Sequence, residues 1–109
     1  MWSIDFVNQK AVDEFLGIPK NIRSRLTHIF ELLKIQGNQL GEPHTKSLQD
    51  GFFEIRAKSS EGIARSIYCY QKGKQILILI SVVKKKDKLP KSIMQIAKYR
   101  LKEFENGNN

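Results

Sequence analysis

Cysteine and histidine are scarce in this sequence: Cys69 is the only thiol, and His28 and His44 are the only imidazoles. One cysteine forms no internal disulfide, and three such ligands spread along the chain do not predict a zinc site. No run reaches the roughly 20 apolar residues of a membrane helix, and the first residues do not read as a signal peptide. We therefore expect a cytoplasmic protein without a metal, a cofactor or a membrane partner.

Acidic residues are also scarce, but only in one half of the chain. The sequence has 19 Lys and Arg residues against 11 Asp and Glu residues, a net charge of +8. Residues 1–45 hold five of each sign, whereas residues 46–109 hold 14 basic and six acidic residues. Positive charge concentrated in one half of the chain produces a one-sided electrostatic field. Such a field is typical of proteins that bind an anionic polymer, and RNA is the expected ligand. The alternative is a basic helix surface that only keeps the protein soluble.

Hydrophobic periodicity predicts a single α+β domain over residues 1–105, followed by a flexible tail at 106–109. Its N-terminal half is expected to hold a strand and an antiparallel hairpin of two helices packed on the sheet. Asn8 is suited to cap the first helix, and Gly17 is suited to end it. The predicted segments are a strand at 2–7, helices from Asn8 to Gly17 and from Pro19 to Gly37, and a polar loop from Gly37 to Ser47.

Strands dominate the C-terminal half until a last helix closes the chain. Because three strands follow one another closely, we expect an antiparallel meander and a mainly antiparallel sheet. The last of them is apolar on both faces, which is typical of a central strand. Pro90 opens the final helix, whose buried stripe is Ile93, Ala97, Leu101 and Phe104. The strands are predicted at 52–58, 63–71 and 75–83, and the full order is β-α-α-β-β-β-α.

Three C-terminal segments match a known family pattern in the same order, at the same spacing and on the same elements. They read SLQDGFFEIR at 47–56, GIARSIY at 62–68 and VKKKDKLP at 83–90. In these motifs the chain resembles the RelE/HigB toxins of toxin–antitoxin systems, and most of all their HigB-like, phage-derived branch. The resemblance implies a RelE/ParE-like fold and a type II toxin that cuts mRNA on the ribosome without a metal. It also implies a cognate antitoxin, commonly a HigA-like helix-turn-helix protein.

Metal-free RNA cleavage uses the ribose 2′-hydroxyl as the nucleophile on the adjacent phosphate. The protein must accept a proton, stabilise negative charge on the phosphate and protonate the leaving oxygen. A guanidinium can hold two phosphate oxygens at once. Arg65 matches the arginine of the family's strand motif and is the first candidate for this role, and Arg56 is the second. Arg56 shares a strand face with Glu54, so a structural ion pair is the alternative for Arg56.

Lysines form the other predicted part of the site. Lys84, Lys85 and Lys88 lie where the central strand ends and the last helix begins, and they complete the candidate catalytic set. Crowded positive charge favours the neutral amine that a general base needs, whereas the alternative is simple electrostatic binding of ribosomal RNA. The residues predicted to contact RNA or the ribosome are Lys46, Lys58, Lys86, Lys91, Lys98 and Lys102. Candidates for proton transfer or base stacking are Tyr68 and Tyr99, with core packing as their alternative.

One departure from the family pattern concerns the general base. Ile80, Ser81 and Val82 stand where several relatives carry histidine, glycine and phenylalanine. The proton acceptor is then Lys84, Lys85 or a tyrosine, or the acceleration is mainly electrostatic. The same departure leaves a second hypothesis, a non-catalytic toxin such as a ParE-like topoisomerase poison, or a basic RNA-binding module. If the protein is a nuclease, cells that express Arg65→Ala are expected to grow again while the variant protein still folds.

Overall fold

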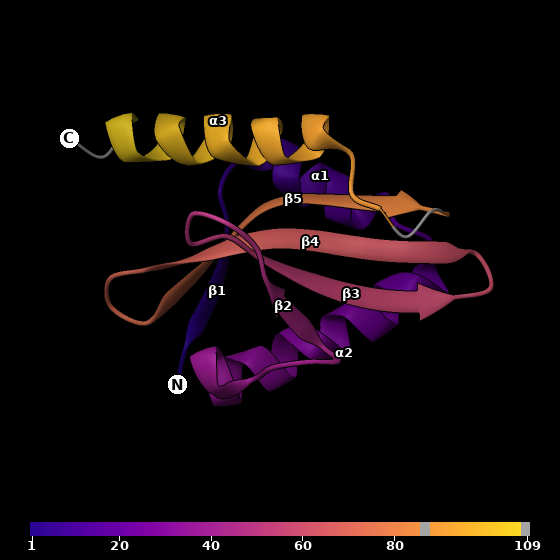
Figure 1. The fold of residues 1–109 in the computed structure, drawn as a ribbon. Coiled ribbons are helices and arrows are strands. Elements are labelled where there is room, and N and C mark those ends of the chain that lie inside the picture. The colour runs from indigo at the N-terminus through magenta and orange to yellow at the C-terminus, as the bar shows by residue number, and fades with distance from the viewer. Residues whose placement is uncertain (86–87, 108–109) are drawn as a thin grey trace.

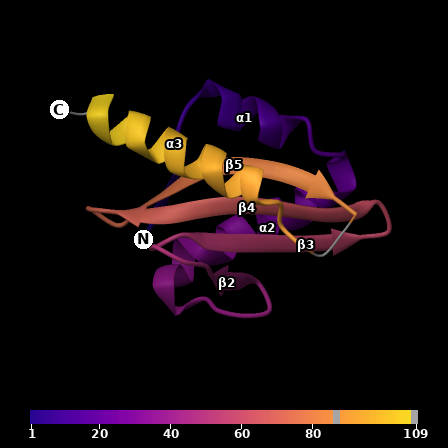
Figure 2. The ribbon, with the colours of Figure 1, turned by 45° about the horizontal axis from the view of Figure 1, so that its top comes forward.

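The computed structural model describes residues 1–85 and 88–107, which form an α+β fold around one five-stranded sheet (Figure 1). The strand order is β1-β5-β4-β3-β2. The elements are β1 (Ser3–Phe6), α1 (Gln9–Leu16), α2 (Lys20–Gln36), a 3₁₀ helix (Gly37–Gln39), β2 (Thr45–Ser47), β3 (Phe53–Ser59), β4 (Gly62–Gln71), β5 (Gln75–Lys84) and α3 (Lys91–Gly107). Figure 2 shows α3 on one side of the sheet and α2 on the other. The predicted fold class is confirmed.

The polar segment after α2 departs from the prediction of a loop. It contains the 3₁₀ helix and β2, which pairs antiparallel with β3 so that Thr45 stands opposite Ile55. The Thr45 hydroxyl also donates to the Leu40 carbonyl at 2.9 Å. The loop prediction is wrong at Thr45–Ser47 because a three-residue polar strand shows no hydrophobic alternation. Pairing with the edge of β3, and not local sequence, makes it a strand.

The opposite edge of the sheet is formed by β1, which pairs parallel with β5. The later strands form the predicted antiparallel meander, and β5 is buried from Ile76 to Ile80, as expected of a central strand. The Asn8 side chain accepts a hydrogen bond from the Ala11 amide at 2.9 Å, so it caps α1 as predicted. Phe15 of α1 stacks on Phe30 of α2, and this contact joins the two N-terminal helices.

Two hydrophobic cores lie on the two faces of the sheet. One packs α2 against residues such as Ile55, Tyr68 and Ile78. The other packs α3 against the opposite face and contains the predicted stripe residues Ile93 and Ala97, with Leu101 and Phe104 packed against it. Helix α3 continues to Gly107, two residues beyond the predicted end of the domain. In the described part of the chain, no helix has the length and apolar character that crossing a membrane requires.

A β-bulge in β5 decides which side chains reach the α3 face. Ile67 of β4 pairs with Ile80, but the next residue, Tyr68, pairs with Ile78, so Leu79 is an extra residue in β5. Leu79 and Ile80 consequently both join the core beneath α3. Because side chains alternate along a strand, the bulge turns the later even-numbered residues of β5 to this face. Without it, Lys84 would lie on the α2 side.

Candidate nucleic-acid interface

Register across β3, β4 and β5 gathers the predicted cations at one end of the α3 face. Arg56 of β3 stands opposite Arg65 of β4, which stands opposite Val82 of β5. In the next row on this face, two residues further along β3, Lys58 and Lys84 flank a single residue of β4. Neighbouring strands lie about 4.8 Å apart, and paired residues share a face. Four cations from three strands therefore occupy two adjacent rows.

A buried carboxylate lies beside the two arginines of this group, two residues before Arg56 on β3. Glu54 is only 2% exposed, and its Oε1 accepts a hydrogen bond from Arg56 Nε at 2.7 Å. Arg65 Nε lies 3.5 Å from Glu54 Oε2, and Lys46 of β2 stands opposite Glu54 in the ladder. Among these described residues, five cations accompany one carboxylate. We call Lys46, Glu54, Arg56, Lys58, Arg65 and Lys84 the cationic end of the sheet.

Exposure differs sharply within the cationic end. The side chain of Arg65 is completely buried, whereas that of Arg56 is 30% exposed. Lys46, Lys58 and Lys84 are exposed. A phosphate that approaches from solvent therefore meets Arg56 and the lysines first, and Arg65 lies behind them against Glu54. That Arg65 holds the phosphate stays a prediction. The burial of Arg65 favours a role that acts through Glu54.

The remaining predicted lysines extend the basic surface beyond the sheet. Lys85 and Lys88 are exposed in the connection between β5 and α3, and Lys86 lies outside the described residues. On α3 the side chains of Lys91, Lys98 and Lys102 are exposed. Lys98 also approaches Asp50 of the β2–β3 connection, with 3.5 Å between Nζ and Oδ2. The lysines follow β5 and α3, and so they form a continuation of the cationic end.

Comparison with known proteins places this chain in a family. The model of the family described as phage derived protein Gp49-like (DUF891) matches residues 13–102. The chain belongs to this Gp49-like family. The family is related to toxins of the HigB and RelE type, which agrees at family level with the sequence resemblance. The comparison with curated proteins finds no match.

The candidate tyrosines of this Gp49-like protein lie on different sides of the sheet. Tyr68 is on the α2 face, stacked on Phe53 with 5.5 Å between ring centroids, and burial beside Tyr70 raises its pKa. Tyr99 is exposed on α3 and donates to Glu103 at 3.1 Å, a bond that raises the pKa of Tyr99. Both remain predictions as proton-transfer groups. Tyr68 is in addition separated from Arg65 by the sheet itself.

The positions of the absent family histidine lie inside the sheet. Ser81 is buried, and its hydroxyl lies 2.7 Å from the hydroxyl of Ser66. Ile80 is buried beneath α3, and Val82 is packed against the same core. Ser81 is therefore engaged with Ser66, and its two neighbours are apolar packing residues. In this Gp49-like chain, these three positions supply no proton acceptor to the cationic end.

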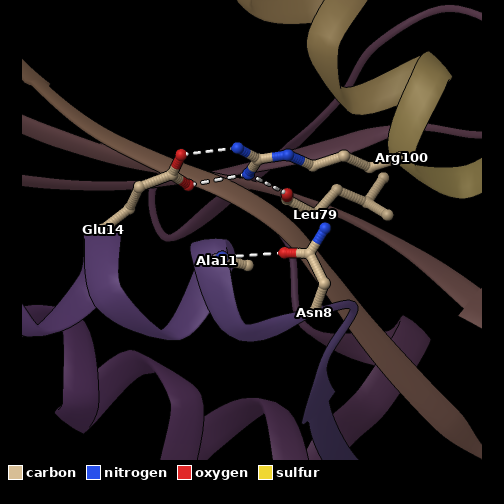
Figure 3. A network of polar contacts seen from close by, with 5 residues as sticks. All are labelled: Asn8, Ala11, Glu14, Leu79 and Arg100. Atoms are coloured by element: carbon tan, nitrogen blue, oxygen red, sulfur yellow. Dashed lines mark hydrogen bonds and ion pairs between the residues drawn. The ribbon is translucent and has the colours of Figure 1, made fainter.

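One arginine was missed by the sequence analysis. Arg100 of α3 donates from Nη1 and Nη2 to the two carboxylate oxygens of Glu14 at 2.8 and 2.7 Å, and from Nη1 to the Leu79 carbonyl at 2.9 Å (Figure 3). It is 8% exposed. The contacts join α3 to α1 across the bulge of β5. Arg100 follows Ala97 by three residues and so lies on the buried stripe of α3. This spacing was the signal in the sequence that the Arg100 side chain points inward.

Proposed function

We propose that this Gp49-like protein is the toxin of a type II toxin–antitoxin system and arrests translation by cutting mRNA on the ribosome. The single observation that carries the proposal is the cationic end, where four strands bring five cations and one buried carboxylate to one end of the sheet. Arg56, Lys58 and Lys84 reach its surface, and a polyanion can contact all three from one side. Family membership supports the same conclusion because Gp49-like proteins are related to HigB and RelE toxins.

The proposed reaction is transesterification within the RNA strand. The 2′-oxygen attacks the adjacent phosphorus, the bond to the 5′-oxygen breaks, and the products are a 2′,3′-cyclic phosphate and a 5′-hydroxyl. The 2′-oxygen gives up its proton, and the leaving 5′-oxygen gains one. Extra negative charge develops on the phosphate oxygens between these events. Arg56, Lys58 and Lys84 stabilise this charge, and groups of this kind contribute about 10²- to 10³-fold each in comparable sites.

Two residues of the cationic end act as positioning groups in this proposal. Glu54 accepts the hydrogen bond of Arg56 Nε at 2.7 Å and so fixes the orientation of that guanidinium. Arg65 lies on the other carboxylate oxygen and offsets the cost of burying Glu54. The proton acceptor is an exposed amine of the junction, Lys85 or Lys84; an amine in this role is neutral at first and stabilises the phosphate only after it has taken up the proton. Lys88 stands in the same connection and binds a flanking phosphate.

The remaining lysines would hold the ribosome and respond to the antitoxin. Lys91, Lys98 and Lys102 present one basic helix surface to ribosomal RNA, and Lys46 extends it from β2. A cognate HigA-like helix-turn-helix antitoxin silences the toxin by covering this surface or by blocking entry to the ribosome. Binding of RNA through such contacts weakens steeply as salt rises, because phosphate-bound counterions are released on association.

Arg56→Ala tests the proposal because Arg56 is partly exposed and its loss leaves the Glu54–Arg65 contact in place. The wild-type protein is expected to arrest growth and to cut mRNA within codons on translating ribosomes. Arg56→Ala is expected to lower the cleavage rate by about 10²-fold or more. Lys72→Ala, an exposed change in the β4–β5 turn at the other end of the sheet, is the matched control and should leave the rate unchanged.

Two results would contradict the proposal that this protein is a nuclease. One is undiminished growth arrest by a folded Arg56→Ala protein, with thermal unfolding used to check the fold. The other is DNA breakage and an SOS response while mRNA stays intact, which is the behaviour of a topoisomerase poison.

A further inference from the structure

A pocket of about 760 Å³ opens beside the cationic end, along the outer edge of β3. Strand β2 covers this edge only as far as the pair formed by Thr45 and Ile55, after which the Arg56 amide donates to the His44 carbonyl at 3.3 Å. Further along, Arg25 of α2 donates to the Lys58 carbonyl at 2.5 Å. The last part of β3 is thus bordered by α2 and the segment before β2, with the pocket between them.

The pocket reaches around the edge of β3 from one face of the sheet to the other. Its lining includes Arg56 and Lys58, which lie on the α3 face, and also Ala57, which packs with the core on the α2 face. Successive side chains of a strand point to opposite faces, so a space that touches all three passes over the strand edge. The cationic end and the pocket are therefore one continuous surface that turns at Arg56 and Lys58.

The lining combines apolar and cationic groups. Ile29, Pro43 and Ala57 supply an apolar wall, Arg25 adds to the cations of β2 and β3, and His28 and His44 add two polar rings. The acidic lining residues are Glu42, which is exposed, and Glu54, which already contacts Arg56 and Arg65. Volumes of about 300–1,000 Å³ with an apolar wall and a few polar groups are typical of small-molecule sites. The chemistry fits a flat, weakly polar ring attached to an anionic group.

We infer that this pocket binds one nucleotide of the RNA substrate, the one adjoining the phosphate held at the cationic end. The inference rests on the proposed function and extends it with a site for a base. The base lies against Ile29, Pro43 and Ala57. The RNA backbone crosses the edge of β3 at Arg56 and Lys58, and the phosphate on the far side faces Arg25 and His28. The pocket is then the part of the protein that can prefer one base over another.

Two substitutions on α2 separate the pocket from the rest of the helix. Ser24 and Thr27 are both exposed, but only Ser24 lines the pocket. Ser24→Glu places a negative charge where the far phosphate is expected, and Thr27→Glu makes the same change in charge outside the lining. Ser24→Glu is expected to weaken RNA binding roughly tenfold, and Thr27→Glu at most about twofold, since close charges are screened least by salt.

Binding is measured with the full chain and a 2′-O-methyl RNA hexanucleotide, which lacks the nucleophile and stays intact. Methyl NMR signals of Ile29 and Ala57 report on the pocket, and that of Ile63 reports on the row between Lys58 and Lys84. All three signals are expected to shift on titration with the hexanucleotide. In Ser24→Glu, the shifts of Ile29 and Ala57 should require a higher RNA concentration.

The outcomes separate this inference from the proposed function. If the hexanucleotide shifts Ile63 alone and both α2 variants bind equally, the pocket assignment is overturned while the cationic end stands. If inorganic phosphate shifts Ile29 and Ala57 as strongly as the hexanucleotide does, the site holds an anion without a base, and the inference again fails. If RNA shifts none of the three signals and mRNA stays uncut in cells, the proposed function fails together with the inference.

Discussion

Arg–Glu contacts form two groups on the α3 side of this fold, and their charge balance differs. Arg100 and Glu14 make a one-to-one pair with two hydrogen bonds, enclosed between α1, β5 and α3 (Figure 3). Glu54 instead contacts both Arg56 and Arg65. The first group is neutral and serves to join elements. In the second, the described cations outnumber the carboxylate, and under the proposed function RNA phosphates would bind its exposed lysines.

Accessibility separates the two groups in the same way. The Arg100 side chain is 9% exposed, and its guanidinium also binds a backbone carbonyl at the bulge. Arg56 is 30% exposed and stands beside the exposed lysines of β3 and β5. A buried ion pair adds little net stability, yet removing one partner is costly because the other charge stays buried. Substitutions can therefore distinguish a structural arginine from one that binds a ligand.

The largest effect is expected for Arg65→Ala, which leaves Glu54 buried with one fewer cation. The free energy of unfolding should fall by about 3–5 kcal/mol, as measured by urea denaturation. If cells that express this variant grow, the cause can then be an unfolded toxin as readily as a lost catalytic group. This revises the sequence-based expectation that Arg65→Ala restores growth while the protein stays folded. The double variant Glu54→Leu with Arg65→Leu should recover part of the loss. A cost for Arg65→Ala below about 1 kcal/mol would show that Glu54 does not depend on it.

Arg100→Met should destabilise the protein less, by about 2–3 kcal/mol, because Glu14 is partly exposed and water can replace part of the contact. Its cleavage rate per folded molecule should stay at the wild-type value, since Arg100 is buried and pairs with Glu14, which is not part of the cationic end. Urea denaturation and a cleavage assay below the unfolding transition measure the two quantities. Lys102→Met, which also replaces a cation by Met but at an exposed position of α3, is the stability control. A lowered cleavage rate in folded Arg100→Met would mean that Arg100 also serves the reaction, and the Arg100–Glu14 pair would no longer be purely structural.

Sequence patterns were sufficient for most of the fold, and the exceptions have physical reasons. The strand at β5 and the stripe of α3 were predictable because each buries a face whose period follows from its own geometry. The bulge at Leu79 was not, because it depends on how β5 pairs with β4. Strand β2 is too short and too polar to show a period. Both exceptions affect the site, since the bulge turns Lys84 toward the α3 face and β2 brings Lys46 beside Glu54.

For the candidate site, sequence analysis selected residues better than it placed them. Motif matching chose Arg56 and Arg65, and their pairing on adjacent strands agrees with a shared location. The apolar–polar alternation of β3 assigned Glu54 to the sheet face opposite Ile55. The same alternation carries no information about what covers that face. The burial of Glu54 and Arg65 comes from tertiary packing. The same holds for the pocket, whose walls come from α2 and β3, segments separated by more than a dozen residues.

A smaller effect is expected from the exposed lysines of the cationic end. Lys58→Ala and Lys84→Ala should each weaken RNA binding at low salt and lower the slope of log K against log salt by about 1. Stability should change by no more than about 0.5 kcal/mol, because neither side chain is buried. Fluorescence anisotropy with a labelled RNA over a series of salt concentrations measures the slope. Arg100→Met should keep the wild-type slope, and a reduced slope there would place Arg100 in the RNA-binding surface.

The smallest effect on stability is expected at the Lys98–Asp50 contact, an ion pair between two exposed side chains. Lys98→Ala should lower the free energy of unfolding by less than about 1 kcal/mol, and high salt should remove the difference. If α3 binds ribosomal RNA, the same variant should slow cleavage on ribosomes more than it weakens binding of a free hexanucleotide. Equal losses in the two assays would mean that Lys98 contacts the substrate itself. The basic surface of α3 would then belong to the cationic end, and docking on the ribosome would need other residues.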